Sequence, residues 1–177
     1  MRDRLLTRLD AFDRLRWGLL DQLDATSPEI LAFVPAPGEW SILEVVEHLV
    51  RAEADVLRGT PPLHELVARP RGLTARLRYV FTNALLRSPI SVGIPSAGMA
   101  PQGNVELAEL RQTWDASQRW LRAYIASEKD LSRAVFVHPV TGPLDVASTI
   151  ALNAVHIRRH LRQIDRVRTA AEAQVSA

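Results

Sequence analysis

Residues 153–164 read NAVHIRRHLRQI, and this stretch carries two histidines, His156 and His160, within a helical pattern of apolar residues. Positions four residues apart lie one above the other on the same face of an α-helix. Two imidazoles placed in this way can bind one divalent metal ion, as in other helical H-x-x-x-H motifs. Because two ligands do not make a tight protein site, a third is needed, and His48 is the best candidate.

His48 lies in a segment that is predicted to be a helix ending near Arg58, before the GTPP sequence at 59–62. Ser41 and Glu44 match the S-x-x-E capping box that precedes many helices. The apolar stripe of this helix comprises Ile42, Val45, Val46, Leu49 and Val56. His48 falls beside the stripe, so we expect its imidazole at the rim of the core, facing a cleft between helices.

Apolar residues at three- and four-residue spacing predict the remaining helices. These cover residues 3–24, 73–87 and 105–127, and a last helix runs from about Leu144 or Asp145 to about Ala171, with a frayed tail beyond. Asn104 can cap the helix at 105–127. The predicted buried face of the 73–87 helix comprises Leu73, Leu77, Val80, Phe81, Ala84 and Leu85.

The connections contain helix-breaking residues and short structured pieces. Ser27 and Pro28 predict a short helix, residues 88–103 are expected to form a long loop, and residues 134–137 are expected to be extended. The long helices with apolar stripes indicate an all-α helical bundle. A length of 177 residues favours one domain spanning residues 1–177.

The composition excludes several classes of site and partner. The chain has no cysteine, so disulfides, zinc–thiolate sites and a cysteine nucleophile are ruled out. No apolar run approaches the roughly 18 residues of a membrane span, and no secretory signal precedes the first helix, so we expect a cytoplasmic protein without a membrane partner. The net charge is +2 and the arginines are scattered among acidic residues, which argues against a nucleic-acid partner.

Other polar residues near the histidines have both a functional and a structural interpretation. Glu44 could serve as a general base or orient His48, although the capping box alone explains it. Asn153 and Gln163 could support the ligands or contact a substrate, or could be surface amides. His138 could mark a loop near the cleft, although an exposed turn is the simpler expectation. Glu47 and Glu53 are expected to be solvated or to support packing. His64 receives no role.

Two blocks of sequence together resemble the DinB/YfiT-like superfamily. Residues 38–41 read GEWS and residues 44–49 read EVVEHL, similar to the second-helix signature of that family. His138-Pro139, the GPL sequence at 142–144 and H-x-x-x-H-L-x-Q-I at 156–164 resemble its final-helix signature. The resemblance implies a four-helix bundle with short extra helical turns in its connections, frequently a homodimer. It also implies a divalent metal ion held by His48, His156 and His160.

The resemblance leaves three functions open. Similar proteins include thiol-dependent S-transferases and isomerases that use bacillithiol, mycothiol or glutathione, and proteins proposed as metal-dependent hydrolases. Three imidazoles accept zinc, nickel or iron and leave a coordination position for water, substrate or a thiolate. We therefore expect a metal-dependent enzyme acting on a small molecule, most simply a thiol-dependent S-transferase. The alternatives are a hydrolase and a non-catalytic metal-binding module in stress or detoxification.

Overall fold

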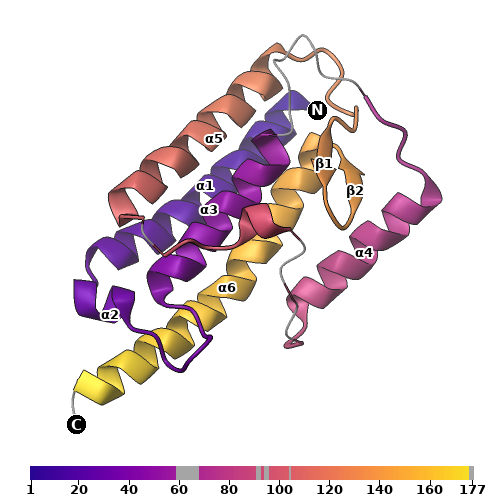
Figure 1. Cartoon of the computed structure of the whole chain (residues 1–177). Coiled ribbons are helices and arrows are strands. Elements are labelled where there is room, and N and C mark those ends of the chain that lie inside the picture. The colour runs from indigo at the N-terminus through magenta and orange to yellow at the C-terminus, as the bar shows by residue number, and fades with distance from the viewer. Residues whose placement is uncertain (59–67, 91–92, 94–95, 104, 176–177) are drawn as a thin grey trace.

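The computed structural model describes residues 1–58, 68–90, 93, 96–103 and 105–175 (Figure 1). Its helices over these residues are α1 (Arg2–Asp24), α2 (Pro28–Ala32), α3 (Ile42–Arg58), α4 (Leu73–Arg87), α5 (Leu107–Ser127) and α6 (Val146–Val175). A 3-10 turn, η2 (Ala97–Met99), and the short strands β1 (Phe136–His138) and β2 (Gly142–Leu144) complete the described elements. None of the described helices has the length and apolar character needed to cross a membrane.

Helices α1, α3, α5 and α6 form a four-helix bundle, which confirms the predicted all-α fold. Each of α1 and α3 packs against both α5 and α6, so the four helices close a ring around one core. Apolar residues from all four helices fill that core, among them Leu9, Leu20, Val46, Leu121 and Ile157. The α6 helix continues to Val175, four residues beyond the predicted end at Ala171.

The predicted capping box begins α3 and thereby fixes the helix that carries His48. The Ser41 backbone N–H donates to Glu44 Oε2 at 2.8 Å, and the Glu44 backbone N–H donates to Ser41 Oγ at 3.2 Å. These reciprocal bonds satisfy two of the donors that a helix N-terminus leaves without partners.

Helix α4 is present where predicted, but its predicted buried face points into solvent. Leu73 is 73% exposed and Phe81 is 66% exposed, and Leu77, Val80 and Ala84 are exposed as well. The helix lies outside the bundle and packs on α6 through the opposite face, where Thr82 is buried (Figure 1). The prediction was wrong because periodicity identifies an apolar face without showing what covers it.

The segment between α5 and α6 forms a small antiparallel hairpin. Strands β1 and β2 pair with Phe136 opposite Leu144 and His138 opposite Gly142. Gly142 has a φ of +74°, a left-handed conformation that glycine adopts without steric cost. The hairpin agrees with the extended backbone predicted for this segment. The predicted helix end at 59–62, the residue His64 and the cap at Asn104 lie outside the described residues.

Candidate metal centre

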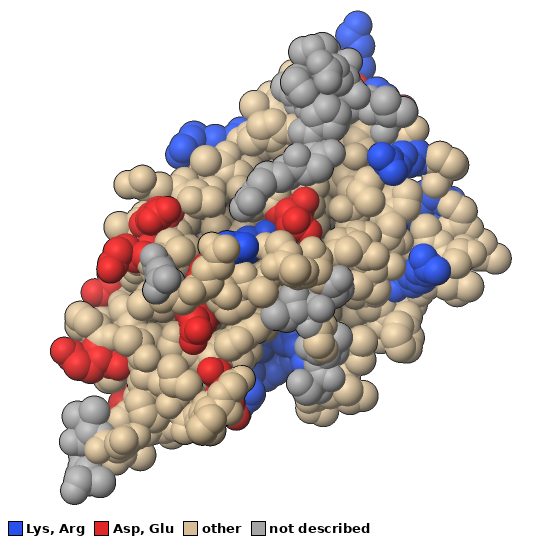
Figure 2. Space-filling model, in the orientation of Figure 1, with Lys and Arg blue, Asp and Glu red and all other residues tan. Residues whose placement is uncertain are grey.

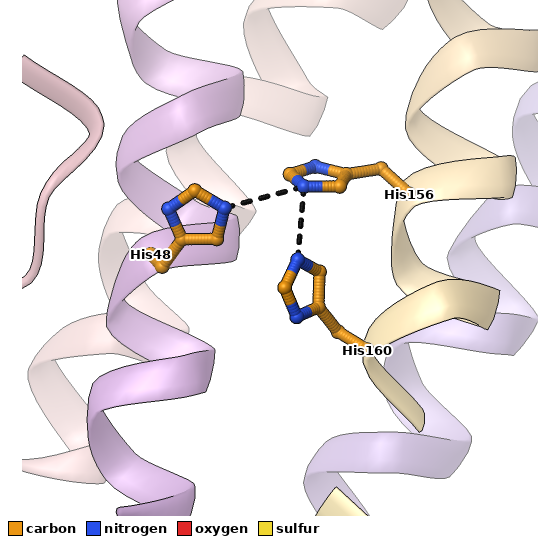
Figure 3. Close-up of side chains that lie close together, drawn as sticks. All are labelled: His48, His156 and His160. Atoms are coloured by element: carbon orange, nitrogen blue, oxygen red, sulfur yellow. Dashed lines mark hydrogen bonds between the residues drawn. The ribbon is translucent and has the colours of Figure 1, made fainter. Parts of the chain in front are cut away.

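The structure brings His48, His156 and His160 together between α3 and α6 (Figure 3). His48 Nε2 lies 3.2 Å from His156 Nε2, and His160 Nε2 lies 3.1 Å from the same atom. One ligand atom from each ring lies within 4.8 Å of the other two. Tetrahedral ligands at zinc–nitrogen distances of about 2.0–2.1 Å stand roughly 3.3 Å apart, so this spacing suits one metal ion.

Hydrogen bonds fix the protonation of two of these rings. His48 Nδ1–H donates to the Met99 carbonyl oxygen at 2.8 Å, and His160 Nδ1–H donates to Gln163 Oε1 at 2.8 Å. Both rings therefore present an unprotonated Nε2 to His156 when they are neutral. The single ring proton of a neutral His156 cannot satisfy both contacts. A divalent cation would accept all three lone pairs, so the donor set fits a metal ion.

The Met99 carbonyl is held at α3 by contacts from the same helix. Glu47, one residue before His48, accepts hydrogen bonds from the backbone N–H groups of Gln102 and Gly103 at 2.9–3.0 Å. Arg51 Nε donates to the Gly98 carbonyl oxygen at 3.2 Å. Two successive turns of α3 thus bind the segment around Met99, whose carbonyl oxygen orients His48.

The surroundings of the site keep its imidazoles neutral. Burial lowers the pKa of His48, and the hydrogen bond to the Met99 carbonyl opposes that shift. Burial, followed by the charge of the neighbouring His160 and His48, lowers the pKa of His156. Burial and the charge of His48 lower the pKa of His160 to about 4. Neutral imidazole is the form that binds a metal, so the site is ready for binding at neutral pH.

The three histidines line a cavity of about 690 Å³. Trp40 packs against His48 with ring centroids 5.0 Å apart, and Arg162 and Arg166 also line the cavity. His138 lies in its wall, with Nδ1 accepting hydrogen bonds from the backbone N–H groups of Val140 and Thr141 at 3.1 and 3.2 Å. A neutral His138 therefore carries its proton on Nε2 and offers an N–H donor.

A family model described as the DinB superfamily matches residues 11–164. The chain belongs to the DinB superfamily. No curated protein and no solved structure matches the chain. The match spans α3 and the part of α6 that bears the histidine pair, so it includes all three members of the cluster in this DinB-superfamily protein.

The other residues singled out in the sequence of this DinB-superfamily protein take different positions. Asn153 lines the cavity, one turn of α6 before His156. Gln163 lines it too and accepts the hydrogen bond from His160. Glu44 engages Ser41 in the capping box. His138 is half-buried in the cavity wall and not in an exposed turn, because the hairpin folds back against α3. This agrees with the alternative that His138 lies near the cleft.

Two glutamates that were expected to be solvated or to support packing, Glu47 and Glu53, are both buried in this DinB-superfamily fold. Glu47 supports the segment around Met99 and is 2% exposed. Glu53 is buried in the bundle and accepts hydrogen bonds from Trp114 Nε1 at 2.9 Å and from Gln118 Nε2. The sequence did contain a signal for the burial of Glu53. It lies four residues after Leu49 and three before Val56, which places it on the apolar face of α3.

Proposed function

We propose that this DinB-superfamily protein is a metal-dependent enzyme that acts on a small molecule, with the chemistry of a thiol-dependent S-transferase. His48, His156 and His160 would hold the zinc, nickel or iron ion. The observation that carries the proposal is the convergence of three Nε2 atoms in a cavity, with two of the rings fixed in the tautomer that binds metal.

When bound, such a metal would stabilise a thiolate or polarise a substrate oxygen. Three protein ligands leave room for a small molecule at the ion, as in catalytic rather than structural sites. A thiol such as mycothiol or bacillithiol is the expected co-substrate.

Residues around the cavity support binding of a small polar molecule. Arg162 and Arg166 line the cavity and favour an anionic group on the substrate or the thiol. The His138 N–H can donate a hydrogen bond to a bound oxygen or sulfur atom without competing for the metal. Trp40 packs against the His48 ring and limits its rotation, which keeps that ring in the binding orientation.

Metal analysis of purified protein tests the site. We expect about one metal ion per chain in the wild type and almost none in the His48→Ala, His156→Ala, His160→Ala triple variant. His138→Gln is the matched control, since it removes a cavity histidine that is outside the ligand set. Equal metal content in the wild type and the triple variant would show that the ligands are wrong.

Turnover with a panel of low-molecular-weight thiols and electrophiles tests the reaction. The proposal expects thiol-dependent product in the wild type and its loss in the metal-free triple variant. Metal-dependent hydrolysis of esters or amides without a thiol would favour the hydrolase. A chain that binds metal but turns over neither class of compound would be a binding module.

A further inference from the structure

Helix α4 presents an apolar stripe to solvent on the outside of the bundle. The exposed fractions are 73% for Leu73, 61% for Leu77, 64% for Val80 and 66% for Phe81, and Ile90 follows at 61%. These α4 positions lie at helical spacing, so they share one face. Soluble monomers rarely expose contiguous apolar surface of this kind without a binding role.

Contacts at both ends of α4 fix the direction in which this stripe points. Before its first turn, Arg71 donates to Ser148 Oγ at 2.8 Å and pairs with Asp145, both at the start of α6. At its C-terminal end, Arg159 of α6 donates to the carbonyl oxygens of Leu85 and Ser88 at 3.2 and 3.0 Å. The inner face is thereby held against α6, and the stripe is a stable feature of the surface.

Arginines flank the stripe, and the stretch of sequence that carries it contains no acidic residue. Residues 66–105 contain five arginines and neither Asp nor Glu, whereas the whole chain is +2, so the rest of the chain is −3. On the helix, Arg76 and Arg87 follow one edge of the stripe and Arg78 follows the other, by their spacing. Figure 2 shows blue but no red atoms over the surface that α4 forms.

The apolar stripe and its flanking arginines together distinguish between the kinds of partner that could cover this face. A symmetric contact between two copies would place the same arginine-rich segment against itself, without an acidic residue from either segment. A nucleic acid would neutralise the arginines but leave Leu77 and Phe81 in water. A bilayer with anionic lipids satisfies both features, since apolar side chains enter the acyl boundary while arginines meet the headgroups.

We propose that the face of α4 formed by Leu73, Leu77, Val80 and Phe81, with Arg76, Arg78 and Arg87 beside it, docks on an anionic membrane surface. The helix would lie in the plane of the interface, as other basic amphipathic helices do, and no spanning segment is needed. The proposal is independent of the reaction at the metal centre. It replaces the expectation of no membrane partner, which rested on the absence of an apolar span in the sequence.

Flotation of the full chain with vesicles tests the proposal. One set contains equal parts of phosphatidylglycerol and phosphatidylcholine, and the other contains phosphatidylcholine alone. We expect binding to the anionic vesicles only, weakened by raising the salt concentration because the arginine contribution is screened. Equal binding to both vesicle types, or to neither, would overturn the proposal.

Two variants separate the apolar and the charged contributions. Leu77→Asp/Phe81→Asp and Arg76→Glu/Arg78→Glu should each lower the bound fraction about tenfold, because each removes one of the two contributions. Both change exposed side chains, so the thermal unfolding midpoint should stay near that of the wild type. The matched control is Val34→Asp, which puts a charge at another exposed apolar residue and should leave vesicle binding unchanged.

Light scattering and DNA titration provide the competing outcomes. The wild type could instead form a homodimer that Leu77→Asp/Phe81→Asp dissociates, and fail to bind anionic vesicles. That result would assign the face to a second copy of the chain and overturn the proposal. Duplex DNA binding that survives Leu77→Asp/Phe81→Asp, again without vesicle binding, would assign the arginines to a nucleic acid and overturn it as well.

Discussion

At the scale of single residues, the ability of the three histidines to bind a metal ion depends on which nitrogen of each ring carries the proton. The sequence predicted His48, His156 and His160 as a set. Helical spacing indicated the pair, and the place of His48 beside an apolar stripe, together with the family resemblance, indicated the third. The sequence could not predict that the Met99 carbonyl would fix the tautomer of His48. That partner is a backbone atom of η2, 51 positions further along the chain, and a pattern of side chains does not reveal it.

Glu53 gives a pH-dependent prediction at the same scale. Burial raises its pKa to about 7 from the ordinary value of 4.5, opposed by the hydrogen bond from Trp114. Between pH 4.5 and pH 7 the folded chain therefore holds a proton that the unfolded chain has lost. This contribution to stability is complete below pH 4.5 and falls as pH rises, by at most about 1.4 kcal/mol per pH unit.

Urea unfolding of wild type and Glu53→Gln at pH 5 and pH 7.5 checks this prediction. The variant has no titratable group at this position, so its stability relative to the wild type should increase with pH. Glu29→Gln is the control, since Glu29 lies on the surface of α2 and lacks the buried contacts of Glu53. A stability difference between wild type and Glu53→Gln that is the same at both pH values would contradict the assignment.

At the scale of elements, apolar periodicity located the helices but not all of their surroundings. The apolar face of α3 is buried as predicted, whereas that of α4 is exposed. Both sequences read as amphipathic helices. Arg71 and Arg159 attach α4 to α6, and the face of α4 that packs inward carries Tyr79, Thr82 and Leu86. Such long-range contacts are invisible in a local sequence pattern.

The capping box of α3 gives the prediction at this scale. Ser41→Ala should lower the free energy of unfolding by about 1 kcal/mol, because the Glu44 backbone N–H loses its acceptor. Chemical denaturation measures the change. Ser127→Ala is the control, since that exposed hydroxyl donates to carbonyl oxygens of its own helix, including Ala123 at 2.9 Å. The change in stability should be less than about 0.5 kcal/mol. Equal losses in both variants would argue against the cap.

At the scale of the whole molecule, the histidine cluster joins two helices that are far apart in the sequence. His48 and His156 are separated by 108 positions. An ion held by both rings would cross-link α3 and α6 in the folded state only. Because a ligand that binds only the folded chain stabilises it, metal binding at the cluster would be coupled to folding.

Thermal unfolding with zinc or with EDTA measures this coupling. At free zinc about a hundredfold above the dissociation constant, the stabilisation is roughly 2.7 kcal/mol, which corresponds to a rise of roughly 5–10 °C in the unfolding midpoint. The triple histidine-to-alanine variant should show no shift. A midpoint that zinc raises equally in both proteins would place the binding outside the cluster.

The position of α4 outside the ring of four helices also affects how its amide hydrogens exchange with solvent. This helix packs on α6 and the hairpin rather than within the ring of four helices, and its inner residues Thr82 and Leu86 line the cavity. Its amide hydrogens should therefore exchange through a local opening that costs less free energy than global unfolding. Each such opening would uncover the histidines while the bundle stays folded. The lifetime of a bound ion or small molecule would then follow the opening of one peripheral helix rather than the unfolding of the protein.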